Sequence, residues 1–319
     1  FGEMVRKLSL TQGGSKVTRD IYPVFDAQLP TDADQRICVW VRDGWSIDEN
    51  SVRADSRQAG NQSPTVFVFI PKRSADDLRH HLIDYKAASA TLDKRGVPNT
   101  PEGTEARAAM ETTKQTAEGK IRELLEEAFS GARVFQGGGN EILGNDLQEM
   151  AIEASSNALQ RLYPQFHTAD HVGWSKVYEK AQKGAPDALK AIGDEGEPAK
   201  NPVCKAILGF IAGGKKGADI RTQFESSPYG WSRDAVDGGL QVLLVAGLIR
   251  AQDERGQTLD PKELERKTIG KVMFKVESAT VTTAQRIQTR KLLQKVGLSA
   301  KQGEELAYIP QFLQKMVEL

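Results

Sequence analysis

Residues 232–252 read SRDAVDGGLQVLLVAGLIRAQ, and this stretch decides the fold expected for the second half of the chain. Ser232 is of the type that caps the start of a helix, and Gly247 is of the type that ends one. The residues between them are mostly Val, Leu, Ala and Gly, which predicts a helix over residues 232–246. Residues 248–252 then read as a strand.

The flanking segments extend this stretch into an ordered set of elements. Three short helices and two strands are predicted: helices at 202–212, 218–225 and 232–246, and strands at 248–252 and 270–276. A glycine- and lysine-rich turn at residues 213–217 separates the first two helices. Three helices followed by a two-stranded ribbon is the order of a winged helix. We therefore expect a winged-helix-like domain over residues 198–280.

The first 197 residues carry apolar runs of another kind. Residues 65–70, TVFVFI, are apolar almost throughout, which is typical of a strand covered on both faces of an α/β sheet. The remaining elements predicted there are a helical lead-in and loop over 1–36, strands at 37–42 and 132–136, and helices at 74–93, 101–130, 146–162 and within 174–193. An α-rich mixed α/β region is therefore expected over residues 1–197.

Capping residues and apolar spacing refine the two long helices. Ser74 and Thr100 stand where the N-caps are needed, and Pro101 fits the first helical position. The end of the second helix is predicted to bury a stripe formed by Ile121, Leu124, Leu125, Ala128 and Phe129.

The ends and the middle of the chain suggest its organisation. Residues 193–202 are rich in Gly, Pro, Asp and Glu, which is typical of a linker, so we place a boundary near residue 198. Residues 281–319 are expected to be the start of a helical bundle that is cut short. Phe1 is not a start methionine, so we expect the chain to be a fragment of a longer protein.

Charge and composition exclude several classes of protein. The 43 Lys and Arg residues equal the 43 Asp and Glu residues, so a basic field over the whole chain is excluded, although a local basic patch is not. Hydrophobic residues make up 39%, which fits a globular protein rather than a disordered one. No apolar stretch reaches the roughly 18 residues that a membrane helix needs, so no membrane partner is expected.

The cysteines and the glycine-rich loops give little sign of chemistry. Cys38 and Cys204 are too few for a disulfide framework or a zinc quartet, and both are expected in the core of a protein from a reducing cytosol. Residues 137–139 and 213–217 are glycine-rich and precede helices, but neither contains the Gly-Lys-Ser/Thr of a P-loop. Both are interpreted as turns, and no catalytic or cofactor-binding residue is assigned.

One histidine pair suggests a metal-dependent alternative. His167, Asp170 and His171 place three metal-binding groups within five residues. A zinc site usually needs a further ligand from elsewhere, so a polar loop is favoured and no metal site is assigned. A metal-dependent nuclease built on these three residues remains the less favoured alternative.

The predicted winged-helix segment contains the candidate contacts to DNA. Residues 201–280 hold 12 Lys and Arg against 10 Asp and Glu, a net charge of +2. Asp234 and Asp237 in the third helix would oppose phosphate, so sequence-specific readout is less favoured than non-specific backbone contact. A protein-packing or structural module is favoured over either mode of DNA binding. The candidate DNA-binding residues are Lys215, Lys216, Arg221, Arg233, Arg250 and Lys271.

Four strings in the sequence carry a resemblance to a known family. They are FQGGG (135–139), ALQRLYPQF (158–166), NPVCKAIL (201–208) and PYGWSRDAVDG (228–238). These strings resemble the BrxC and PglY proteins, the large P-loop ATPases of bacterial BREX phage-exclusion systems, over about residues 35–300. The resemblance implies a cytoplasmic antiviral-defence protein, an AAA+-like ATPase that binds ATP and magnesium and works with other BREX proteins.

The chain departs from that family in lacking a Walker A lysine, so no catalytic residue is carried over and the fragment itself is not expected to be an enzyme. We expect a non-catalytic assembly region that contacts partner subunits or further copies of itself, and double-stranded DNA non-specifically. The alternatives are a winged-helix DNA-binding regulator and the metal-dependent enzyme described above.

Overall fold

The computed structural model describes residues 9–96, 98–277, 283–301 and 305–318. The chain divides into two compact units: the first comprises Phe1–Leu10 and Asp20–Leu162, and the second comprises Thr11–Arg19 and Tyr163–Leu319. Helices and a β-sheet are present in both units, so the protein is of the mixed α/β class that the sequence predicts.

The first sheet and the helices that alternate with its strands are formed by residues 9–162. In chain order the elements are β1 (Ser9–Gln12), β2 (Val17–Val24), η1 (Ala33–Gln35), β3 (Ile37–Asp43), α2 (Glu49–Gln58), β4 (Val66–Ile70), α3 (Ala75–Arg95), α4 (Pro101–Ser130), β5 (Arg133–Gln136), β6 (Glu141–Ile142) and α5 (Leu147–Leu162). The six strands lie in their sequence order; β2, β3 and β4 are parallel, and β5 and β6 continue the sheet antiparallel.

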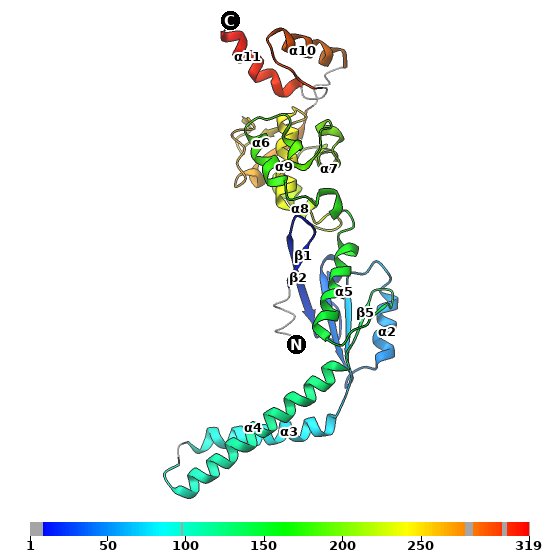
Figure 1. Ribbon diagram of the computed structural model, residues 1–319, viewed down its shortest axis with the longest axis vertical. Coiled ribbons are helices and arrows are strands. Elements are labelled where there is room, and N and C mark those ends of the chain that lie inside the picture. Colours follow the sequence, from blue (N-terminus) through cyan, green and yellow to red (C-terminus); the bar gives the residue numbers. More distant parts are fainter. Residues whose placement is uncertain (1–8, 97, 278–282, 302–304, 319) are drawn as a thin grey trace. The chain divides into compact units, whose positions relative to one another are not determined.

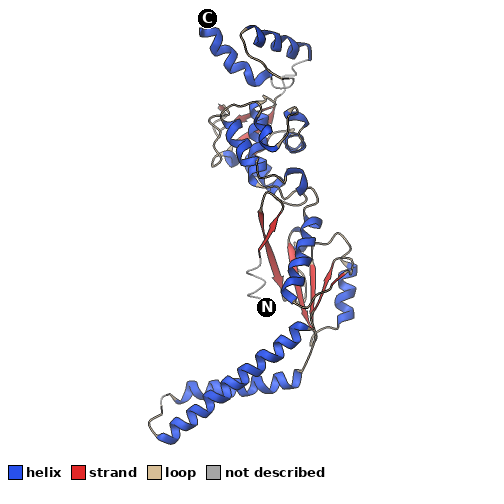
Figure 2. Ribbon diagram, viewed as in Figure 1, coloured by secondary structure: helices blue, strands red, loops and turns tan. Residues whose placement is uncertain are grey.

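Helices cover both faces of this sheet, which explains its apolar central strands. Cys38, Trp40, Phe67 and Phe135 form one cluster with Val52 of α2. The alternate residues of β3 and β4 are also buried, and α5 packs against β3, β4 and β5 (Figure 2). The continuous apolar run of β4 is therefore what a strand between two helical layers requires.

Helices α3 and α4 form a long hairpin that projects from the sheet (Figure 1). The 30 residues of α4 give it a length of about 45 Å at 1.5 Å per residue. Thr100 caps α4 as predicted, because its side chain accepts a hydrogen bond from the Gly103 amide. Ser74 precedes α3 in a left-handed conformation, and its side chain makes no capping hydrogen bond. In the predicted stripe at the end of α4, only Ala128 is fully buried.

The second unit contains a smaller sheet and several short helices. In chain order its elements after residue 162 are η2 (Phe166–Ala169), α6 (Trp174–Gln182), η3 (Ala188–Ile192), η4 (Pro198–Lys200), α7 (Pro202–Ile211), β7 (Lys215–Lys216), α8 (Gly217–Glu225), α9 (Arg233–Val245), β8 (Ile249–Gln252), β9 (Thr258–Leu259), η5 (Ile269–Lys271), β10 (Met273–Val276), α10 (Thr283–Lys295), η6 (Glu305–Tyr308) and α11 (Ile309–Glu318).

Helix α9 is the centre of this unit. Every residue from Ala235 to Val245 is buried, and α6, α7 and α8 all pack against the helix. Ser232 caps α9 by accepting a hydrogen bond from the Ala235 amide, as the sequence predicts. Trp174 of α6 lies against Gly238, where a Cβ atom would come within 3.0 Å of the indole ring. The small residue at this position therefore lets the two helices approach closely.

Two sequence expectations differ from the structure. The helical lead-in expected within residues 1–36 is replaced over the described residues 9–24 by strands β1 and β2. The compact units divide between Leu162 and Tyr163, whereas composition places a boundary at residue 198. The physical reason is the packing of α6 on α9, which ties the segment before residue 198 to the helices after it.

The helices predicted at the end of the chain are present as α10 and α11, although residues 281–282, 302–304 and 319 lie outside the described residues. Glu305, at the start of η6, comes between α10 and α11 in the chain, and its side chain is fully buried. Its carboxylate pairs with Arg290 at 3.1 Å and with Arg286 at 3.7 Å. This ion-paired cluster joins η6 to α10.

Candidate nucleic-acid interface

The four-stranded sheet of the second unit has one face turned away from the core. Its strand order is β7-β10-β8-β9, and all three pairings are antiparallel. Phe274 and Ala251 are paired and fully buried, so they define the inner face. Because side chains alternate along a strand, their neighbours occupy the outer face.

The register aligns the outer residues in two rows. In the first row, Lys216, Met273, Gln252 and Thr258 lie side by side across the four strands. In the second row, Lys275 is paired with Arg250. Three of these six side chains are cationic and none is acidic. We call Lys216, Arg250 and Lys275 the cationic sheet face.

The exposure of this face permits contact with a large partner. Lys216 and Arg250 are exposed, and Lys275 is half-buried. Within the described part of the chain, none of the three forms an ion pair with a carboxylate. Their charges are therefore not neutralised by carboxylates of the protein. Cations that bind phosphate need to be available in this way.

The predicted DNA-binding residues divide into two groups. Lys216 and Arg250 lie on the cationic sheet face, and Lys271 is exposed in η5, two residues before β10. Lys215 is paired with Phe274 and so follows the inner face, and its Nζ atom lies 5.2 Å from the centre of the Phe210 ring. Lys215 therefore does not join the outer row.

Arg221 and Arg233 are already engaged within the protein. The Nε and Nη2 atoms of Arg221 each donate to Asp237 at 2.9 Å, and Nη2 also donates to the Arg266 carbonyl at 2.8 Å. Asp237 is fully buried, and only 15% of the Arg221 side chain is exposed. Arg233 forms a two-bonded pair with Glu225, although it remains exposed. Arg221 is thus held within the protein by Asp237, and its assignment as a DNA contact stays a prediction.

Burial sets the electrostatics of the Arg221–Asp237 pair. Removal from water raises the pKa of the Asp237 carboxyl, and the hydrogen bonds and charge of Arg221 oppose that rise. Arg266 adds a second cation nearby and lies over the Tyr178 ring at 4.4 Å. Arg266 in turn pairs with Asp234 at the start of α9. The cations and carboxylates around α9 are therefore matched to one another.

Lys275 is the residue that the sequence prediction missed. Lys275 lies within the strand predicted at residues 270–276. Because side chains alternate along a strand, Lys275 is on the outer face of the sheet and Phe274 is on the inner face. Counting the charges of each face of the ribbon separately, rather than over the whole segment, would have identified it.

The histidine motif does not converge on one point. Asp170 accepts hydrogen bonds from the amides of Gly14 and Ser15 and from the Ser15 hydroxyl. His167 Nδ1 lies 3.0 Å from the Pro164 carbonyl, and His171 Nδ1 accepts from the Gly173 amide at 2.9 Å. Among the described residues, no group of three His, Cys, Asp or Glu side chains is placed to hold a metal ion.

The hydrogen bonds of Asp170 hold the turn between β1 and β2, which belongs to the second unit together with Asp170. Partial burial raises the pKa of the Asp170 carboxyl, but the hydrogen bonds from Ser15 and Gly14 outweigh burial and lower the pKa below its ordinary value. Gly13 at φ +65° lies against the same carboxylate, where a Cβ atom would be 2.3 Å from an oxygen. Asp170 therefore has a structural role in the described chain.

Residues 137–139 form a turn, as the sequence predicts, whereas within 213–217 Lys215–Lys216 form β7 and Gly217 begins α8. Gly138 and Gly139 both have positive φ, and their amides donate to the carbonyls of Ser56 and Gln136. Gly217 donates to the Val272 carbonyl in the same way. Three of the amides that a phosphate would need are thus already bonded within the protein.

Both cysteines are fully buried in the core, as expected. Burial raises the pKa of each thiol above its ordinary value. Neither residue has the exposed, thiolate-stabilising surroundings that a nucleophile needs.

Comparison of the chain with protein-family models, with curated proteins and with solved structures finds no match. Among the residues that the structure describes, no helix has the length and hydropathy of a membrane span.

Proposed function

We propose that the cationic sheet face binds the phosphate backbone of double-stranded DNA without reading its sequence. The observation that carries this proposal is the strand register, which aligns Lys216, Lys275 and Arg250 on one face with no carboxylate among the six outward positions. Phosphate contacts supply most of the affinity of non-specific binding, and they need accessible cations rather than donors matched to bases.

The burial of α9 argues against sequence-specific recognition. The elements from α7 to β10 follow the winged-helix order, and we propose that they form a winged-helix module. In that motif the third helix enters the major groove, but α9 is buried from Ala235 to Val245 and is packed against α6. The side chains of Ala235–Val245 cannot reach base edges without unfolding this contact, and the exposed Arg233 is paired with Glu225, so we propose that the module presents its sheet instead.

We further propose that the chain is a non-catalytic assembly region of a bacterial BREX ATPase of the BrxC and PglY type. The support for this proposal is the set of four sequence strings, two of which, at 201–208 and 228–238, include parts of α7 and α9. In the parent protein, ATP and magnesium would be bound outside this chain, and the partners would be other BREX proteins or further copies. DNA binding by the sheet would then hold such a cytoplasmic assembly on phage or host duplex.

The experiment is a DNA titration with charge-matched variants. Fluorescence anisotropy of two labelled duplexes of unrelated sequence is measured with the native chain and with Lys216→Ala/Arg250→Ala/Lys275→Ala. The control is Lys176→Ala/Lys180→Ala/Lys205→Ala, which removes three exposed cations of α6 and α7 in the same unit.

The proposal expects equal affinity for both duplexes and a loss of at least about 10-fold per removed contact at about 50 mM salt in the sheet variant. The control variant should bind within about threefold of the native chain. Equal losses in the two variants would show that net charge alone governs binding. Preference for one duplex would contradict the backbone mode.

A further inference from the structure

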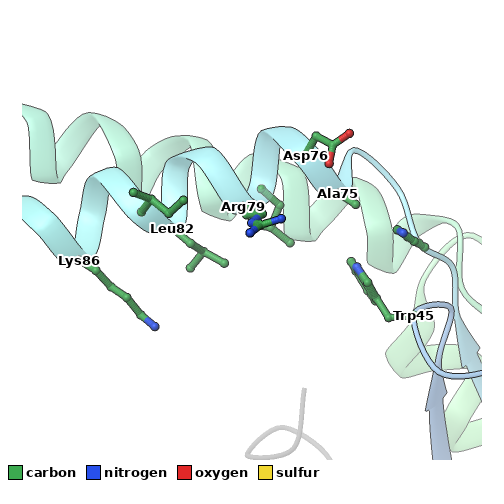
Figure 3. Close-up of a pocket in the computed structure, with 9 residues that line it drawn as sticks. Trp45, Ala75, Asp76, Arg79, Leu82 and Lys86 are labelled. Atoms are coloured by element: carbon green, nitrogen blue, oxygen red, sulfur yellow. The ribbon is translucent and has the colours of Figure 1, made fainter.

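Helix α3 and Trp45, in the loop that follows β3, carry an exposed apolar surface. Trp45 is 50% exposed, and Leu82 and Ile83 are 39% and 57% exposed. These residues line an open pocket of about 530 Å³ (Figure 3). Trp45 contrasts with Trp174 and Trp231, which are each 2% exposed in the core of the second unit. A half-exposed tryptophan in a pocket is a frequent anchor of protein interfaces.

The pocket follows one face of a helix. Ala75, Arg79, Leu82 and Lys86 line it at intervals of four, three and four residues, which is the spacing of a single helical face. From Ala75 to Lys86 this face is about 16 Å long at 1.5 Å per residue. Because α4 packs along another side of α3, the lining residues remain accessible. The pocket is therefore a groove as long as about three helical turns.

The charges around the groove have one predominant sign. Lys72, Arg79 and Lys86 line it and are all exposed, whereas Asp76 is its one carboxylate. Within the described residues, none of the three cations forms an ion pair. Figure 3 shows Arg79, Leu82 and Lys86 in succession along α3, with Trp45 near the start of the helix. The apolar centre is thus bordered by an excess of positive charge.

We propose that this groove binds an acidic amphipathic helix, about three turns long, from a partner protein. The apolar face of such a helix fits against Trp45, Leu82 and Ile83, and its flanking Asp or Glu side chains pair with Lys72, Arg79 and Lys86. This is the helix-in-groove mode of recognition, in which apolar side chains at helical spacing on the bound helix fill the groove. A nucleic acid backbone would satisfy the cations but would leave the apolar centre without a partner.

The test is a peptide selection on the whole chain. A phage-displayed library of random peptides about 16 residues long, enough for four helical turns, is selected on the native protein. A parallel selection uses Lys72→Glu/Arg79→Glu/Lys86→Glu, and every enriched peptide is then titrated against Trp45→Ala/Ile83→Asp. All five positions are exposed, and circular dichroism confirms that each variant keeps its helix content.

Native protein should enrich peptides with apolar residues at helical spacing and flanking Asp or Glu. Those peptides should lose more than 10-fold in affinity on the Trp45→Ala/Ile83→Asp variant, and the charge-reversed variant should enrich Lys- and Arg-rich helices instead. Failure to enrich any peptide, enrichment without acidic residues, or unchanged binding to the Trp45→Ala/Ile83→Asp variant would overturn the proposal. Duplex DNA bound by the native groove and lost on charge reversal would also overturn it.

Discussion

Replacing Arg221 with alanine removes the partner of a fully buried carboxylate. Arg221 and Asp237 share two hydrogen bonds of 2.9 Å, and Asp237 has no exposed surface. Breaking a buried ion pair from one side costs about 3–5 kcal/mol, because the remaining charge is left uncompensated. The stranded carboxylate can limit the cost by taking up a proton. Protonating a carboxyl with an ordinary pKa of about 3.9 costs about 4 kcal/mol of free energy at pH 7.

The pH dependence follows from the sign of this change. Without Arg221, the pKa of Asp237 in the folded state rises further above its unfolded value, so the folded state binds more protons than the unfolded state. The deficit of the variant relative to the native chain therefore grows with pH, by up to about 1.4 kcal/mol per pH unit, between the folded-state pKa of Asp237 in the native chain and that in the variant. We expect a deficit of about 3–4 kcal/mol at pH 7 and a smaller deficit at pH 5.

The assay is urea unfolding followed by tryptophan fluorescence at these two pH values. Trp40→Phe and Trp45→Phe in the background leave Trp174 and Trp231, which are both buried in the second unit. Arg233→Ala is the matched control, because Arg233 also makes a two-bonded pair but is 64% exposed. It should cost under about 1 kcal/mol. A deficit below about 1 kcal/mol for Arg221→Ala, or one that is the same at both pH values, would refute the structural role of the pair.

Three further predictions concern the turns and the cysteines. Gly138→Ala should destabilise the first unit by about 1–3 kcal/mol in urea unfolding, because φ is +89° and the new Cβ would lie 1.8 Å from Asn61 Oδ1; an unchanged midpoint would contradict this. Asp170→Asn should cost about 1–2 kcal/mol at pH 7, and the native chain should lose the same contribution as pH falls below about 4, since the lowered pKa of Asp170 stabilises the fold only while the group is ionised. Cys204 should react with a thiol reagent only after unfolding, because burial raises its pKa; rapid reaction of the native chain would disprove its burial.

The elements that the sequence predicts correctly are those specified locally. Ser232 and Thr100 cap α9 and α4 through hydrogen bonds to residues three positions later, so a short window of sequence contains the whole interaction. The run at 65–70 is apolar on both faces, which only a doubly covered strand needs. Strands β7 and β9 have two residues each and are defined by their pairing with β10 and β8. A pattern within two residues is too short to predict a strand from the sequence.

The residues of the cationic sheet face could not all be predicted from the sequence, because their availability depends on contacts between residues that are distant in the chain. Arg221 and Arg250 look alike as exposed cations in the sequence, yet Arg221 meets Asp237 on a different helix and Arg250 meets no carboxylate among the described residues. The burial of α9 likewise depends on α6, which precedes the linker-like segment at 193–202. What could have been read locally was the alternation around Phe274, which assigns Lys275 to the outer face.

The central claim, backbone binding by the cationic sheet face, is tested most directly by the salt dependence of DNA affinity. For three phosphate contacts, the slope of log affinity against log salt is about −2.7, which is about a 40-fold loss of affinity between 50 mM and 200 mM salt. Each single variant, Lys216→Ala, Arg250→Ala or Lys275→Ala, should make the slope shallower by about 0.9. Slopes that stay at the native value in all three single variants would contradict the account.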